Sequence, residues 1–250
     1  MINTLMGKYS GPGRSGALRT GFPSGATWGT GSTGVTLSNG NLLANMPPGT
    51  SDRVVSGNSA SAIPANRKIY MEYEGFTNSH TIGCGFHNNL TATLGSIWYR
   101  FYITNIDADL PRAPGANATY LGSNSNTTQY FGGSQNNAPV DFDRAADNGK
   151  GINLTGWAID TINNKVWVRC TGTNSGSYDD WMGGGNPEDS TSTPTFSADF
   201  TGLYFFGASY YVSFPSGEVA VPIRLRLGTN NDDVNYNFTY TPPVGFDYNE

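Results

Sequence analysis

Two glutamates are the residues of this sequence whose spacing best suits paired acid–base chemistry. Glu72 and Glu74 lie two positions apart in an alternating apolar–polar run, so in a β-strand both would occupy the same face. Glycosidases work with two carboxylates whose oxygens lie ~5–10 Å apart. However, Glu74 is followed at once by Gly75, where the run ends. We therefore expect the pair on a polar outer face, and an endo-acting glycosidase is the remote alternative.

Histidine and cysteine are too sparse for nucleophilic or zinc chemistry. The chain has two histidines, His80 and His87, and two cysteines, Cys84 and Cys170. In a strand, Cys84 and His87 would point to opposite faces, which excludes a nucleophile–base pair. No further Cys or His is near enough in sequence to complete a metal site. We expect two buried thiols, and a bridge between them stays open if their strands are neighbours.

One acidic segment offers oxygen ligands of the kind that calcium prefers. Asp141, Asp143 and Asp147 follow one another closely, but their spacing does not match an EF-hand loop and its closing glutamate is missing. We expect a solvated loop here. The sequence thus predicts no catalytic residue, no metal site and no cofactor.

Aromatic side chains are better candidates for a recognition surface. Trp98, Arg100 and Tyr102 alternate with apolar residues and would share one strand face. Tyr178 and Trp181 lie in a loop rich in Asp and Gly, where they could stack on a sugar ring or pack on a partner. Trp, Tyr and Arg dominate binding hot spots, so these five are the predicted partner- or ligand-binding residues. The alternatives are that long loops cover the row and that the loop aromatics pin their own loop.

The elements that must position these residues are short strands. Alternation with a period of two covers residues 69–74, 97–103, 223–227 and 234–238, and Ile162–Lys165 is typical of a tight hairpin turn. Such strands without helical segments predict an all-β, antiparallel β-sandwich. The predicted core comprises Ile69, Met71, Tyr99, Phe101, Trp157, Ile159, Val166, Val168, Leu225 and Phe238.

Charge and composition exclude several classes of partner. Of the 250 residues, 13% are charged and 13% aromatic, and the net charge is −5. All three charges within residues 1–34 are basic, so the remainder carries −8. An acidic body of this kind disfavours nucleic acid, which is bound mainly through Lys and Arg on phosphates. The sequence contains no apolar stretch of about 18 residues, so no membrane span is predicted. The amino terminus does not resemble a signal peptide.

The first 34 residues differ from the rest of the chain. They contain nine glycines and no alternating run, which predicts an extended arm (1–34) before a sandwich domain (35–250). Ordering so many glycines has a high entropic cost, so we expect the arm to lie against another chain. Its predicted anchoring residues are Leu5, Lys8, Arg14, Leu18, Arg19, Phe22 and Trp28.

Six pieces of sequence, in order, resemble one family. They are Val35–Leu42, Lys68–Tyr73, Ile82–Phe86, the hairpin Gly156–Val168, the loop Trp181–Pro187, and the closing segment Val234–Phe246. Together they resemble the SPRY-like branch of the concanavalin-type (jelly-roll) β-sandwiches, particularly the versions found in virion proteins of tailed bacteriophages.

The resemblance implies a non-enzymatic virion structural protein. It would be a capsid decoration, head-fibre or tail-associated protein that displays a SPRY-like interaction domain and attaches through residues 1–34 to other virion proteins. A homo-oligomer, assembled in the host cytoplasm and located in the virion, is expected. The alternative is a receptor- or glycan-binding tip of a tail fibre, which would contact a host surface.

Overall fold

The structure is a computed structural model of the chain. It describes residues 21–47, 53–77, 81–93, 98–104, 119–123, 129–131, 151–171, 181, 185–210, 221–228 and 236–248. Within these ranges the only helix is one 3-10 turn, η1 (Ser59–Ser61).

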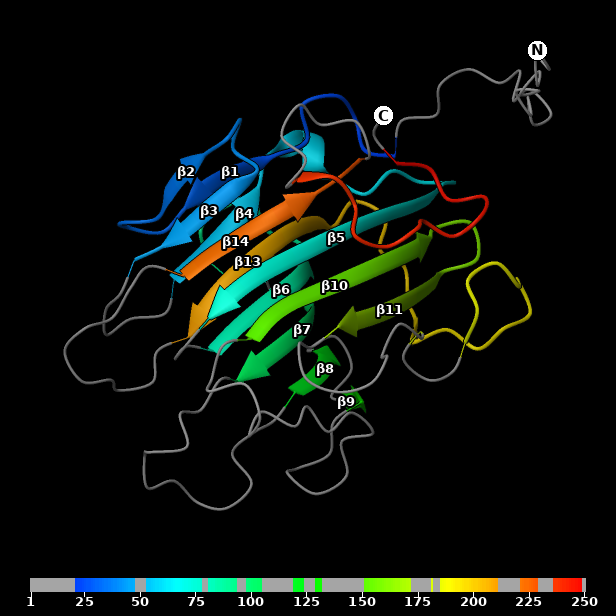
Figure 1. The fold of residues 1–250 in the computed structure, drawn as a ribbon. Coiled ribbons are helices and arrows are strands. Elements are labelled where there is room, and N and C mark those ends of the chain that lie inside the picture. The colour runs from blue at the N-terminus through cyan, green and yellow to red at the C-terminus, as the bar shows by residue number, and fades with distance from the viewer. Residues whose placement is uncertain are drawn as a thin grey trace, which may run out of the picture.

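The strands form two antiparallel sheets of seven strands each, stacked as two layers (Figure 1). In spatial order, the first sheet contains β1 (Trp28–Gly31), β4 (Arg53–Gly57), β13 (Tyr204–Tyr210), β6 (Thr81–His87), β7 (Trp98–Thr104), β8 (Thr119–Ser123) and β9 (Gln129–Phe131). The second contains β12 (Phe196–Ser197), β11 (Lys165–Thr171), β10 (Gly151–Asp160), β5 (Lys68–Thr77), β14 (Val221–Arg226), β3 (Leu43–Met46) and β2 (Thr36–Ser38). The predicted all-β antiparallel sandwich is confirmed.

The core lies between the two sheets and follows the alternation of the strands. On β5, Ile69, Met71 and Tyr73 face inward and are at most 1% exposed. Aromatic rings join the layers: Phe86 of the first sheet meets Trp157 of the second with ring centroids 5.3 Å apart. Edge-to-face pairs of this kind add to the stabilisation from apolar burial.

Most of the predicted core residues lie in this inner layer. Those confirmed there are Ile69, Met71, Tyr99, Trp157, Ile159, Val166, Val168 and Leu225. The side chain of Phe101 lies outside the described residues. Phe238 is a correction: it is half-buried on the other side of the second sheet, against Tyr70, because residues 236–238 form no strand and lie across that face.

The predicted boundary at residues 34/35 is wrong for residues 21–34. β1 is an edge strand of the first sheet and pairs with β4. Phe22 and Trp28, predicted as anchors on another chain, are 1% and 0% exposed in the core of their own sandwich. Their irregular spacing conceals this role, because each fills the core from a different local conformation. Residues 1–20, including Leu5, Lys8, Arg14, Leu18 and Arg19, lie outside the described residues.

Turns account for two further details of the chain path. The segment Val35–Leu42 is not one strand, because Asn39, Gly40 and Asn41 all have positive φ and turn the chain between β2 and β3. The hairpin between β10 and β11 is confirmed, and Asn164 has the positive φ (54°) that such a turn requires. Within the described ranges, no helix is long and apolar enough to cross a membrane.

Candidate functional site

The most unusual part of the molecule is the outer face of the second sheet, the face turned away from the core. Tyr70, Glu72 and Glu74 of β5 point to this face, since they alternate with the core residues of the same strand. Glu72 is 0% and Glu74 6% exposed. The solvated outer face expected from the sequence is therefore wrong. The C-terminal residues 236–248, which we call the strap, cover this face (red in Figure 1).

Glu72 lies at the centre of the contact with the strap. Its Oε2 accepts a hydrogen bond from the backbone N–H of Thr239 (2.8 Å), and its Oε1 accepts one from the N–H of Tyr240 (2.9 Å). The hydroxyl of Tyr70 donates to the same Oε1 (2.9 Å). Both carboxylate oxygens are thus occupied by donors from the protein.

Glu74 forms the second half of the cluster through ion pairs with β14. Its Oε2 accepts hydrogen bonds from Arg224 and from Nη2 of Arg226 (2.6 Å). Nη1 of Arg226 reaches the strap, where it donates to the carbonyl oxygen of Asn237 (2.7 Å) and to Oγ1 of Thr239 (2.6 Å). Arg226 therefore bridges the sheet and the strap.

A third cation, Arg169 of β11, completes the face. Nη2 of Arg169 donates to the hydroxyl of Tyr70 (2.8 Å) and to the carbonyl oxygen of Thr241 (2.9 Å). Its guanidinium lies over the rings of Tyr240 (4.0 Å to the centroid) and Trp181 (4.6 Å). Cation–π contacts of this kind strengthen when water is excluded.

Gly156 of β10 provides the room that this arrangement needs. It is paired in register with Glu72 on one side and Arg169 on the other. A Cβ at this position would lie 2.5 Å from the hydroxyl of Tyr70 and 3.1 Å from Nε of Arg169. Any side chain here would displace the hydrogen-bonded cluster.

Burial shifts the titration of the face. It raises the pKa of Glu72 above its ordinary value, against the opposing effect of the hydrogen bonds from the strap and the charge of Arg226. Burial, together with the nearby charge of Glu72, raises the pKa of Tyr70 well above its ordinary value. Paired acid–base chemistry needs carboxylates that a substrate can reach, whereas these two are committed to the arginines and the strap.

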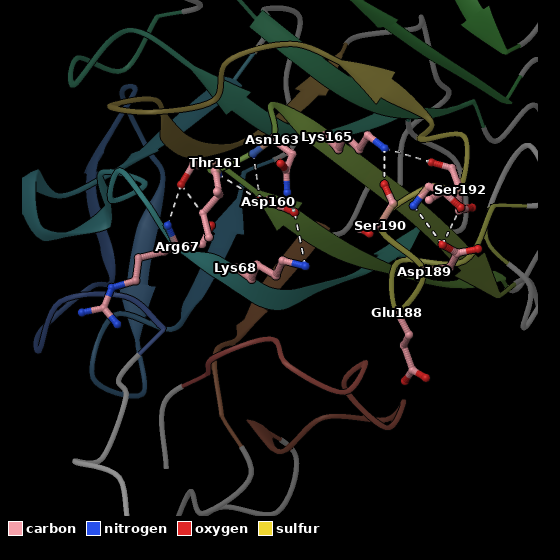
Figure 2. A network of polar contacts seen from close by, with 12 residues as sticks. Arg67, Lys68, Asp160, Thr161, Asn163, Lys165, Glu188, Asp189, Ser190 and Ser192 are labelled. Atoms are coloured by element: carbon pink, nitrogen blue, oxygen red, sulfur yellow. Dashed lines mark hydrogen bonds and ion pairs between the residues drawn. The ribbon is translucent and has the colours of Figure 1, made fainter.

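A second polar cluster lies where β10 turns into β11 (Figure 2). Oδ1 of Asp160 accepts hydrogen bonds from the backbone N–H of Ile162 (2.9 Å) and Asn163 (3.0 Å), and Oδ2 lies 3.4 Å from Nζ of Lys68. Nζ of Lys165 donates to the carbonyl oxygen of Ser190 (2.5 Å) in the neighbouring loop. These contacts fix a hairpin and a loop, and Asp160 is only 1% exposed.

The structure separates the residues predicted as a binding surface. Trp98, Arg100 and Tyr102 lie in β7, beside β6 and β8 of the first sheet, and their side chains are outside the described residues. Tyr178 is outside them as well.

Trp181 is described, and it lies over the second sheet. It is half-buried and packs edge-on against Tyr70 with ring centroids 6.4 Å apart. Of the two alternatives for this residue, its contacts favour the one in which it pins its own loop to the sandwich.

Cys84 and His87 are both buried, and the expectation of a buried thiol is confirmed for Cys84. Cys84 is a free thiol in the core, so it forms no bridge with Cys170. Burial raises the pKa of Cys84 to about 12. Burial lowers the pKa of His87 to about 4, and its ring lies 4.8 Å from that of Phe206. Within the described part of the chain, no three His, Cys, Asp or Glu residues gather closely enough to hold a metal ion.

Comparison with solved structures returns lectin domains. The exoplasmic/lumenal domain of VIP36, bound to Ca²⁺ and Man3GlcNAc, is 13% identical, with a TM-score of 0.40 over 88% of this chain and 93% of that one. A legume lectin-like domain from Entamoeba histolytica is 9% identical, with a TM-score of 0.43 over 80% and 87%. Peanut lectin is 12% identical, with a TM-score of 0.42 over 78% and 88%. The fold of this chain is the two-sheet antiparallel β-sandwich described above.

These likenesses concern the two-sheet architecture and carry no argument about ligands. No protein-family model matches the sequence. No curated protein matches it either.

Sequence reasoning missed the covered face, although the sequence does carry a signal for its ion pairs. Arg224 and Arg226 alternate along their strand just as Glu72 and Glu74 do along theirs. Two alternating strands with opposite charges on their polar faces are expected to pair, and β14 does lie beside β5. Nothing in either pattern indicates that a third segment covers the charges.

Proposed function

We propose that this chain is a non-enzymatic virion structural protein of a tailed bacteriophage. One observation carries the non-enzymatic part: Glu72 and Glu74, the best candidates for paired acid–base catalysis, are buried in ion pairs and hydrogen bonds with their own chain. The virion assignment rests on the SPRY-like sequence resemblance, a finer classification within the concanavalin-like fold. A rigid sandwich with long loops suits display, because loops can vary without altering the core.

Attachment is assigned to residues 1–20, the part of the predicted arm that precedes the sandwich. This segment keeps all three cations of the amino-terminal region, while the remainder of the chain carries a net charge of −8. Lys8, Arg14 and Arg19 would pair with acidic groups on a neighbouring capsid or tail subunit or on a second copy of this chain. Such pairs would contribute more where they are shielded from water than at an open surface.

A receptor- or glycan-binding tail-fibre module is the second candidate. The residue that would serve it is Trp181, because its indole is only half-buried and a sugar could stack on the accessible part of the ring. A glycan array tests this function. Binding that is lost in Trp181→Ala, with an unchanged melting temperature, would favour the fibre-tip role over decoration.

The virion role is tested by mass spectrometry and imaging of purified particles of the phage that encodes the chain. Copy numbers that match the capsid lattice would indicate decoration, and a few copies at the tail would indicate adhesion. Absence of the chain from intact particles would contradict the proposal.

The non-enzymatic role is tested by assays on common polysaccharides, where hydrolysis is expected to be undetectable. Activity that Glu72→Gln or Glu74→Gln abolishes would contradict it.

A further inference from the structure

Part of the strap is held through its backbone by side chains of the sheet beneath it. Glu72 accepts hydrogen bonds from two consecutive backbone N–H groups, those of Thr239 and Tyr240. Backbone N–H groups are common to every polypeptide except at proline. The strap bends at these two residues, which lets both N–H groups reach the same carboxylate. This part of the contact therefore recognises the backbone of a bent segment, and not one particular side chain.

Two arginines hold the carbonyl groups on either side of those N–H groups. Arg226 donates to the carbonyl oxygen of Asn237, and Arg169 donates to that of Thr241. Four backbone groups within five residues are thus engaged by three charged side chains from β5, β11 and β14. Charge-assisted hydrogen bonds of this kind are stronger than neutral ones.

Aromatic contacts add a preference for sequence. Phe238 packs edge-on against Tyr70 with ring centroids 4.9 Å apart, and the ring of Tyr240 lies under the guanidinium of Arg169. The face thus fits a bent segment with two aromatic residues separated by one residue. In the strap, Pro242 and Pro243 follow shortly afterwards.

Covering a sheet with buried charges, as beneath the strap, has a high desolvation cost. Burying an ion pair is often no better, and sometimes worse, than packing apolar residues of similar size. The outer face of an antiparallel sheet also needs no cover at all, since it can face water. An ordinary second core would bury apolar side chains against one another. Here the buried charges of Glu72, Arg169 and Arg226 instead bind backbone groups of the strap, as a polypeptide-binding surface would.

The strap can leave the sheet without breaking a strand. Its strand-type pairing is limited to isolated bridges, Gly228 with Asn237 and Ile69 with Asp247, and it belongs to neither seven-stranded sheet. Two of its side chains are buried, since Tyr236 is 2% and Phe246 3% exposed, whereas Val244 is 71% exposed. The strap is therefore a layer added to a finished sandwich, and a competing segment has to replace its contacts.

We propose that the outer face of β5, β10, β11 and β14 is a polypeptide-binding surface that the strap occupies in the isolated chain. Its partner is a segment of a second polypeptide that has the aromatic–x–aromatic pattern and free N–H groups at the two residues after the first aromatic, and that can bend there as the strap does. The strap competes with that segment for the same side chains. This inference does not depend on the virion role.

The test uses the full chain with Thr239→Pro, which removes one of the two N–H donors and the hydroxyl that Arg226 contacts. The probe is a fluorescent peptide of residues 236–248, followed by anisotropy. We expect the peptide to bind Thr239→Pro saturably and at least tenfold more tightly than it binds the unaltered chain, whose own strap competes. The same peptide carrying Thr239→Pro should bind at least tenfold more weakly than the unaltered peptide.

Two second-site variants show whether the peptide occupies the face. Adding Glu72→Gln to the Thr239→Pro chain should weaken peptide binding at least tenfold. The matched control is Asp199→Asn, at an exposed carboxylate that accepts a hydrogen bond from the N–H of Thr201 in its own loop, and it should change binding less than twofold. Failure of the folded Thr239→Pro chain to bind, or binding that Glu72→Gln leaves unchanged, would overturn the proposal.

If Thr239→Pro does not fold, the full chain can be cut after folding. A protease site placed at residues 230–233 frees the strap as a peptide. Exchange of the cut strap for the labelled peptide would support the proposal. A cut strap that leaves only when the sandwich unfolds would contradict it.

Discussion

The two faces of the second sheet are built from the same strands by different physical means. The inner face buries Ile69, Met71 and Tyr73 of β5 against the first sheet. The outer face buries Glu72 and Glu74 of the same strand against arginines and the strap. The hydrophobic effect forms the inner layer without regard to direction, whereas the outer layer depends on a few directional contacts.

This difference predicts which changes each layer tolerates. An apolar core accepts substitutions of similar volume. A substitution that removes volume destabilises it, and the loss of stability grows with the size of the cavity. A buried polar network loses stability when one partner is removed, because the remaining charges are then left uncompensated. The same location on a strand can thus be sensitive to volume on one side and to charge on the other.

The largest effect is expected from removing the amino-terminal part of the inner layer. Deleting residues 2–28 removes Phe22, Trp28 and the start of β1, and the loss should be comparable with the total stability of a domain. Deleting residues 2–20 should leave a folded protein. Circular dichroism during heating should show a cooperative transition for the shorter deletion only. A cooperative transition in both would mean that β1 is dispensable.

A single core truncation comes next. Trp157→Ala should lower the free energy of unfolding by about 3–5 kcal/mol, because a fully buried indole leaves a large cavity. Ile162→Ala, in the exposed turn of the same β10–β11 hairpin, is the matched control and should change it by less than about 0.5 kcal/mol. Urea unfolding measures both. Similar effects for the two would refute the assigned strand register.

A charge removed from the outer layer should have a smaller effect. Glu74→Gln should lower the free energy of unfolding by about 2–3 kcal/mol, below the range for fully buried pairs because Arg224 and Arg226 remain partly exposed. Glu188→Gln, at an exposed carboxylate, should cost about 0.5 kcal/mol or less. If Glu74→Gln proves as mild as Glu188→Gln in urea unfolding, the outer cluster contributes no specific stability.

The smallest effect is a dependence of stability on pH that arises from His87 in the first sheet. Burial lowers the pKa of His87 to about 4 in the folded protein, so below pH 6.5 the unfolded chain binds a proton that the folded chain does not. Stability is therefore complete above pH 6.5 and declines as the pH falls toward 4, by about 2 kcal/mol between pH 7.5 and 5. The difference between the unaltered chain and His87→Gln in urea unfolding at the two pH values isolates this contribution. Parallel pH profiles would contradict it.

How much could be predicted from the sequence follows the same division. The alternation in 69–74 and 223–227 identifies the strands and the inner core, because apolar burial repeats with the pleat. The place of Trp28 in its own core could not be predicted, since a single indole in a glycine-rich segment has no periodic neighbours. The outer cluster was missed because its closure depends on residues 236–248, far from Glu72 in sequence, and no local pattern encodes which distant segment covers a polar face.

The central claim is that Glu72 holds the strap on the outer face of the second sheet. Hydrogen exchange of the unaltered chain and of Glu72→Gln tests it directly, with the amides of Thr239 and Tyr240 as the readout. We predict that Glu72→Gln accelerates exchange at these two amides at least tenfold, while the amides of β10 and β13 keep their protection. Unchanged protection at Thr239 and Tyr240 in Glu72→Gln would contradict the account.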